Sequence, residues 1–196
     1  MGLLLGRGCA ACGSAGPRLC AHCAAGLLPV GDARSAPGIA SIVTAWQYSS
    51  TARSLVLELK LRGRRAPADA LARGMCSALL KTGCRAEAVT WVPGRRADIR
   101  QRGFDHAEIL GRAVAAGLGL PAQRLLVRLR AQPDQAGLSG AARLRNLDGV
   151  FASRGCSRPV LLVDDLVTTG ATVRVCIAAL RAAGAPRVEV VAACRA

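Results

Sequence analysis

Aromatic residues and lysine are both scarce in this chain of 196 residues. Aromatics make up 3% of the sequence, so a hydrophobic core must be built from alanine, valine and leucine. The shortage also counts against a protein that holds single-stranded nucleic acid by stacking bases on aromatic rings. No apolar run approaches the roughly 20 residues of a membrane-spanning helix. Residues 1–8 are too short for a secretory signal and carry a charge too early, at Arg7. We therefore expect a globular, cytoplasmic protein with no membrane span.

Arginine supplies nearly all of the positive charge, because Lys60 and Lys81 are the only lysines. With 27 basic and 12 acidic residues, the formal net charge is +15. Such a charge favours a polyanionic partner such as nucleic acid. A composition rich in arginine and alanine and poor in lysine also arises from a GC-rich genome. Both interpretations of the charge stay open at this point.

Four of the nine cysteines lie close together near the N-terminus, as two CxxC pairs. Tetrahedral zinc takes four thiolates, and each CxxC turn presents two of them to one ion. Disulfides are rare in the cytoplasm, so metal binding is the better interpretation. We expect a structural zinc module over residues 1–28, in which the metal supplies much of the folding energy. Its predicted ligands are Cys9, Cys12, Cys20 and Cys23, and the other five cysteines are interpreted as small core residues.

Residues 29–38 contain two prolines and two glycines and predict a linker. From residue 39 to 196 the pattern alternates between strands and helices, which predicts one α/β domain with a mainly parallel sheet flanked by helices. The apolar runs at 160–163 and 188–193 are typical of strands covered by helices on both faces. The expected strands are 39–48, 88–92, 125–129, 160–163 and 187–193, and the expected helices are 51–61, 67–80, 104–118 and 172–183.

Asp164 and Asp165 follow the strand 160–163 directly and are the only adjacent acidic residues. Ligands bind beyond the carboxyl ends of such strands, where paired carboxylates are costly unless hydroxyl groups or a cation meet them. A ribose offers two hydroxyl groups, and Mg²⁺ offers positive charge. The next residues lead into a helix whose first N–H groups suit a phosphate. The pattern predicts a site for a phosphorylated ribose, with the phosphate held by Thr168, Thr169, Gly170, Ala171 and Thr172.

The run 160–172 resembles the phosphoribosyl pyrophosphate (PRPP) motif of type I phosphoribosyltransferases. Further segments are similar to the ComF family of competence proteins, and with the four cysteines they extend the resemblance over nearly the whole chain. These segments are Lys60-Leu61-Arg62-Gly63, Val92-Pro93 with Arg102-Gly103-Phe104, and Gln135–Leu138 with Arg143, Asn146 and Phe151. The resemblance implies a type I phosphoribosyltransferase-like fold with an N-terminal zinc knuckle.

The resemblance also implies roles for single residues. Asp164 and Asp165 would be the catalytic pair that holds the ribose hydroxyl groups, with Mg²⁺ nearby. Arg95 and Arg96 would contact the pyrophosphate, since arginine forks match phosphate oxygens. The segment 131–148 would be a lid that closes over the site. Its residues that match the family are Gln135, Arg143 and Asn146.

Two functions are implied. The first is a phosphoribosyltransferase, a glycosyltransferase that acts on PRPP with an acceptor that the sequence does not name, linked to DNA uptake in natural transformation. The alternative is a non-catalytic competence factor that binds single-stranded DNA, contacts the competence machinery and uses the pocket as a ligand sensor.

One departure from the family is Asp105-His106 in place of its usual Asn-Gln pair. We expect Asp105 to cap the following helix. His106 is a candidate general base only through its imidazole, and we expect it to lie exposed on the first helical turn.

Overall fold

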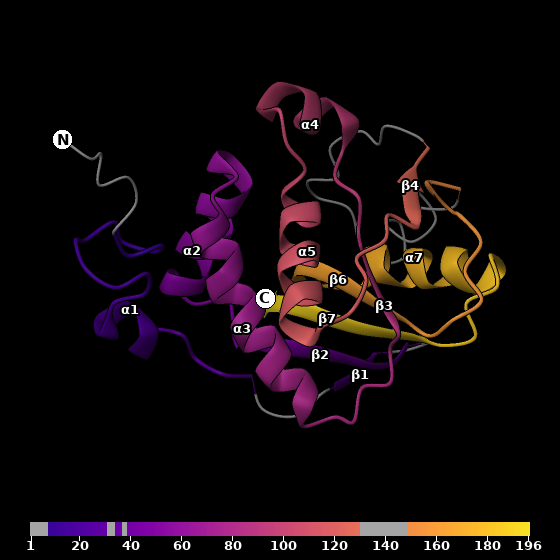
Figure 1. Ribbon diagram of the computed structural model, residues 1–196, viewed down its shortest axis with the longest axis horizontal. Helices are drawn as coiled ribbons and strands as arrows, with labels where there is room; N and C mark the ends of the chain where they lie inside the picture. Colours follow the sequence, from indigo (N-terminus) through magenta and orange to yellow (C-terminus); the bar gives the residue numbers. More distant parts are fainter. Residues whose placement is uncertain (1–7, 31–33, 37–38, 130–148) are drawn as a thin grey trace.

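A mainly parallel sheet flanked by helices forms the centre of the molecule (Figure 1). The computed structural model describes residues 8–30, 34–36, 39–129 and 149–196. In those ranges the main sheet has five strands in the order β1-β2-β7-β6-β3. Only β1 runs antiparallel to its neighbour, which confirms the predicted α/β class. The strands are β1 (Arg34–Ala36), β2 (Ile39–Gln47), β3 (Ala88–Trp91), β6 (Val160–Val167) and β7 (Val188–Arg195).

The helices cover both faces of this sheet (Figure 1). The helices in the described ranges are α1 (Ala21–Ala25), α2 (Ser50–Arg62), α3 (Arg65–Leu80), α4 (Arg96–Arg102), α5 (His106–Leu118) and α7 (Ala171–Ala182). Of these, α1 lies in the cysteine-rich segment and α4 buries no residue, so neither covers the sheet. Residues from α2, α3 and α5 pack in one hydrophobic cluster, and residues from α7 pack in a second one. We call these two sides the α5 face and the α7 face. A separate two-stranded antiparallel sheet, β4 (Leu126–Arg128) with β5 (Phe151–Ser153), packs against α7.

Strand β6 shows how the two faces are separated. Side chains alternate between the faces of a strand. Leu161 and Val163 belong to the cluster on the α5 face, whereas Val160 and Leu162 belong to the cluster on the α7 face. All four are completely buried, as the continuous apolar run predicts. The two residues that continue this alternation are Asp164 and Asp165.

Local signals set the ends of several helices. Ser49 caps α2 by accepting a hydrogen bond from the backbone N–H of Ala52, 3.4 Å away. Gly63 ends the same helix in the left-handed conformation, at a φ of 59°. Gly170 precedes α7 with a φ of 73°, which turns the chain sharply between β6 and the helix.

The structure departs from the sequence prediction in several segments. Strand β6 continues through the acid pair to Val167, so both acidic residues belong to the strand and do not follow it. Helix α4 was not predicted, because it buries no residue and so carries no apolar period. Part of the predicted linker, 34–36, pairs with β2 as β1. The predicted lid, with Gln135, Arg143 and Asn146, lies outside the described residues. Within the described ranges, no helix has both the length and the apolar character needed to cross a bilayer.

Candidate functional site

The carboxyl groups of Asp164 and Asp165 lie on opposite faces of β6. Asp164 lines a small hollow of about 40 Å³ on the α7 face, together with the segment 166–173. Asp165 lies on the α5 face, where its side chain is 7% exposed. The backbone N–H of Asp165 donates a 2.9 Å hydrogen bond to Oδ1 of Asp164. The acid pair therefore does not present two carboxylates to one pocket.

The loop from Thr168 to Thr172 forms the rest of the hollow beside Asp164. Thr168 and Thr169 are exposed, and Oγ1 of Thr169 accepts a hydrogen bond from the N–H of Ala171 at 3.4 Å. The first turn of α7 begins at Ala171, where backbone N–H groups have no partner within the helix. A helix of 12 residues also carries partial positive charge at this end. The predicted phosphate loop and Asp164 thus line one hollow.

Two basic side chains meet Asp165 on the other face of the strand. Nζ of Lys60 lies 3.0 Å from its Oδ2, and Nε2 of His106 lies 2.9 Å from the same atom. Burial by itself raises the pKa of Asp165, but His106 and Lys60 outweigh it and lower the pKa below its ordinary value. The His106 side chain is 12% exposed, so the expectation of an exposed histidine is wrong. The side chain turns inward because a buried carboxylate receives it.

Asp164 differs from its neighbour in protonation. Burial and the adjacent Asp165 carboxylate raise the pKa of Asp164 to about 8. At neutral pH Asp164 therefore keeps its proton, while Asp165 is ionised. Two carboxyl groups in adjacent positions seldom ionise together unless cations meet both. Here the basic side chains of Lys60 and His106 meet Asp165.

The segments 60–63 and 102–104, which resemble the same family in sequence, pack against each other. Nη1 of Arg102 donates a 3.1 Å hydrogen bond to the carbonyl of Lys60, and its Nε donates to the carbonyl of Asp98 at the same distance. The Phe104 ring covers Gly63 so closely that a Cβ at that glycine would lie 2.9 Å from the ring. We call this contact between the ends of α2 and α4 the α2–α4 corner. It holds the end of α2, from which Lys60 reaches Asp165.

Asp105 caps α5, as predicted. Its Oδ1 accepts a 3.1 Å hydrogen bond from the N–H of Ala107, and the side chain is almost fully buried. Nη2 of Arg124 lies 3.7 Å from its Oδ2. The N-terminus of α5 and the side chain of Arg124 therefore stabilise the negative charge of Asp105.

One of the two predicted pyrophosphate contacts, Arg95, lies near Arg128, a residue that no sequence motif singled out. Arg95 is the N-cap residue of α4, and Arg96 is exposed at its first position. Arg128, at the end of β4, interacts electrostatically with both Arg95 and Asp164. Within the described part of the chain, no contact ties Arg96 to the hollow. Arg128 belongs to no sequence motif, and only the pairing of β4 with β5 places it here.

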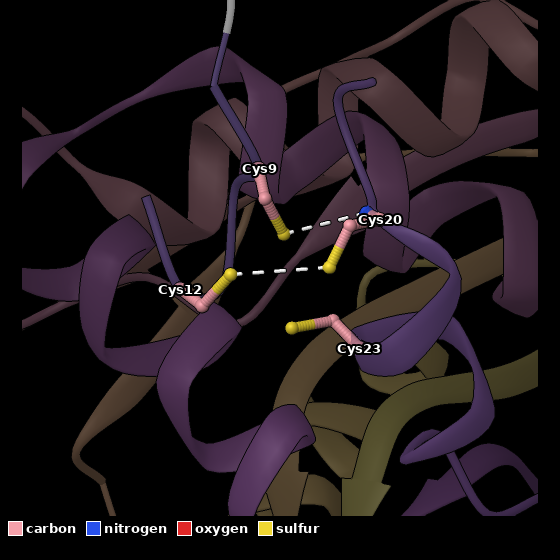
Figure 2. A group of neighbouring side chains, drawn as sticks. All are labelled: Cys9, Cys12, Cys20 and Cys23. Atoms are coloured by element: carbon pink, nitrogen blue, oxygen red, sulfur yellow. Dashed lines mark hydrogen bonds between the residues drawn. The ribbon is translucent and has the colours of Figure 1, made fainter. Parts of the chain in front are cut away.

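The four N-terminal cysteines converge on one point (Figure 2). Their sulfur atoms all lie within 4.8 Å of one another, and those of Cys12 and Cys20 are 3.9 Å apart. Four thiolates at the usual zinc distance of about 2.3 Å would lie about 3.8 Å apart in a tetrahedron. The set therefore fits a tetrahedral ion. Cys9 and Cys23 are buried, whereas Cys12 is exposed.

The cysteine module packs on α2 and α3. Ala10 and Leu27 belong to the cluster on the α5 face. Oγ of Ser49 donates a 2.8 Å hydrogen bond to the carbonyl of Gly26, and Arg18 pairs with Asp69 of α3 at 3.1 Å. Of the other cysteines, Cys176 and Cys194 are fully buried, as predicted, and Cys76, Cys84 and Cys156 are partly buried.

Two curated proteins are similar to the chain in sequence. The DNA utilization protein YhgH of Salmonella typhimurium is 32% identical over 165 residues, which cover 79% of this chain and 71% of that protein. The protein of the same name from Salmonella typhi is 32% identical over 167 residues, with the same two shares. No family model matches the chain.

One solved structure with a similar fold is the glutamine phosphoribosylpyrophosphate amidotransferase of B. subtilis in complex with ADP and GMP. It shares 22% of its residues in the aligned region, with a TM-score of 0.47. The alignment covers 70% of this chain and 30% of the enzyme, so the chain spans less than a third of that enzyme's length. A likeness of this degree adds nothing to the α/β class that the strand order shows.

Proposed function

Because the chain belongs to the ComF family, together with the DNA utilization protein YhgH, we propose that it binds PRPP with Mg²⁺ and transfers the phosphoribosyl group to an acceptor. One observation carries the proposal. A carboxyl group, Asp164, and the N-terminal turn of α7 line the same hollow at the end of a parallel strand. Ligands of α/β proteins bind at this end of the sheet. We propose that the process served is linked to DNA uptake, as the resemblance to competence proteins implies, and the relatives are named for DNA utilization.

The hollow supports separate roles for its two sides. The loop 168–172 binds the 5-phosphate, because N–H groups and the helix dipole both favour an anion there. Asp164 accepts hydrogen bonds from the ribose hydroxyl groups. Asp165 acts from the opposite face, since its carboxylate is already held by Lys60 and His106. In this proposal Asp165 fixes the charge and position of the strand beside the substrate.

Mg²⁺ would supply positive charge to the pyrophosphate, and the hollow contains one carboxyl group, Asp164, that can hold it. Arginine side chains at the start of α4, Arg95 and Arg96, are proposed to contact the pyrophosphate as well. The acceptor forms a bond to C1 of the ribose and loses its proton. Pyrophosphate leaves with the electron pair of the broken C1–O bond. The chain contributes by positioning and by electrostatic stabilisation of the separating charges.

Calorimetric titration with PRPP and MgCl₂ tests the proposal on Asp164→Asn and Asp165→Asn separately. We expect Asp164→Asn to weaken binding by about tenfold or more, because charge-assisted hydrogen bonds to the ribose are lost. Asp165→Asn is expected to lower thermal stability first, since Lys60 then lacks its buried partner. Asp69→Asn, which removes a carboxylate paired with Arg18 at the surface, is the matched control. Equal PRPP affinity in the wild type and in Asp164→Asn would refute the site.

The alternative, a factor that binds single-stranded DNA, is favoured by a different observation. The chain has a net charge of +15, and Arg96 and Arg100 of α4 are exposed. If this candidate is right, the affinity for a labelled single-stranded oligonucleotide falls steeply with salt concentration, because phosphate contacts release counterions. The absence of binding at low salt in a fluorescence anisotropy titration would exclude it.

A further inference from the structure

Arg128 is held on the α7 face by two contacts that fix its guanidinium group. Its Nε lies 3.4 Å from the carbonyl of Pro93, to which it donates a hydrogen bond. Its Cζ lies 4.6 Å from the centroid of the Phe151 ring, at the start of β5. Stacking on a ring restricts the plane of the guanidinium, and the backbone contact restricts its rotation. The side chain is therefore preorganised between β5 and the loop after β3.

The positive charge of Arg128 is not neutralised by an ion pair within the described part of the chain. Among the described residues, none has a carboxylate within ion-pair distance of it, although Asp98 and Asp164 act on it electrostatically. Burial lowers the pKa of Arg128, and repulsion from Arg95 lowers it further. The guanidinium groups of Arg95 and Arg128, from different elements, thus act on each other as like charges. Like charges in such a position repel each other, and an anion between them converts the repulsion into attraction.

Arg112 offers a comparison, because it also lies over an aromatic ring but forms an ion pair with a carboxylate. Its Cζ lies 5.7 Å from the Trp91 ring, so it also rests on an aromatic side chain. Its guanidinium, however, pairs with the carboxylate of Glu108, with Nη2 2.9 Å from Oε1. The charge of Arg112 is therefore neutralised by an ion pair, whereas Arg128 has no such pair within the described part of the chain.

We propose that Arg128 binds the pyrophosphate group of PRPP and so distinguishes PRPP from ribose 5-phosphate. This inference rests on the proposed function and adds a residue to its site. Asp164 and the loop 168–172 line one hollow on the α7 face, and Asp164 acts electrostatically on Arg128. A ligand with one anionic group at each end and hydroxyl groups between them matches this order. The Nη atoms of Arg128 supply a planar fork for phosphate oxygens.

The test compares Arg128→Gln with the matched control Arg112→Gln. PRPP, inorganic pyrophosphate and ribose 5-phosphate, each with MgCl₂, are titrated calorimetrically against the wild type and both variants. We expect Arg128→Gln to weaken PRPP and pyrophosphate by about tenfold or more, as the loss of a charge-assisted pair implies. The affinity for ribose 5-phosphate should stay unchanged, which also reports that the variant is folded. Arg128→Lys, which keeps the charge without the fork, should retain part of the PRPP affinity.

The outcomes separate this inference from the proposed function. If the wild type does not bind PRPP, the proposed function fails and the inference fails with it. If the wild type binds PRPP and Arg128→Gln binds it equally well, only the inference is overturned. Equal weakening of ribose 5-phosphate and PRPP would also overturn it, because Arg128 would then support the whole pocket and not its pyrophosphate end.

Discussion

The two neighbouring carboxyl groups of β6 differ because a strand sends adjacent side chains to opposite faces. Asp165 meets Lys60 and His106 on the α5 face, and its pKa is lowered. Asp164 lies in the hollow on the α7 face with no such partner in the described part of the chain, and its pKa is raised to about 8. The group in the candidate site therefore starts with a proton that a ligand must displace.

PRPP affinity should depend on pH through Asp164. Binding to Mg²⁺ and ribose hydroxyl groups needs the carboxylate, so the affinity should rise as pH increases from 7 through the raised pKa of about 8, and then level off. One proton is released on binding below that pH. Calorimetry in buffers of different ionisation enthalpy measures this release.

Asp164→Asn is the control for the pH dependence. Its residual affinity should vary with pH only as the titration of PRPP itself requires. A wild-type profile that matches the profile of Asp164→Asn would show that Asp164 is already ionised in the unbound protein.

At the level of helices, the position of Lys60 depends on a corner where two helices end. Gly63 ends α2 and Gly103 ends α4, both with positive φ, at 59° and 79°. Phe104 covers Gly63, and Arg102 holds the carbonyl of Lys60. The surroundings of the two glycines differ, because a Cβ at Gly103 would meet nothing within 4 Å.

The two glycines form a matched pair of substitutions. Gly103→Ala should cost about 1 kcal/mol in unfolding free energy, from left-handed backbone strain alone. Gly63→Ala should cost about 1–3 kcal/mol more, because the new Cβ displaces the Phe104 ring. Urea denaturation of both variants measures the difference. Equal losses would mean that the Phe104 ring yields without cost and that the corner is not rigid.

Across the whole molecule, the sheet separates the side chains of the candidate site from a buried cluster of charged and basic side chains. The α7 face carries the hollow, Asp164 and Arg128. The α5 face carries the buried cluster of Asp165 with Lys60 and His106, and the cysteine module packs on helices of the same face. Because Ala10 and Leu27 of the module belong to that face's hydrophobic cluster, the module contributes to the folding of the main domain.

Zinc content and stability should therefore change together. We expect one zinc ion per chain, and Cys12→Ser should reduce this content sharply. The midpoint of thermal unfolding should fall by about 5 °C or more, as a loss of ~2 kcal/mol implies for a chain of this size. Elemental analysis and calorimetry measure the two quantities. Cys156→Ser, outside the cluster, is the control and should change neither. Full stability of metal-free Cys12→Ser would show that the module does not support the domain.

The features that sequence alone predicted are those whose parts lie close together in the chain. The CxxC pairs, the strand followed by the acid pair and the glycine turn before α7 each span few residues, so their spacing fixes their local geometry. The alternation of apolar strands and helices likewise predicted the α/β class, because each element carries its own period. The cap at Asp105 was predicted for the same reason.

The tertiary structure decided which distant residues meet. Asp165 and Lys60 are far apart in the sequence and meet only in the folded chain, so no sequence motif predicts the pair. His106 was expected at the surface because its own helix gives no sign of a buried carboxylate across the interface. Arg128 reaches the site through the pairing of β4 with β5. The sequence by itself determined where the acid pair, the turn before α7 and the two CxxC pairs lie. Strand alternation sends the two acids to opposite faces, and only the fold decided which side chains each of them meets, because those partners come from remote elements.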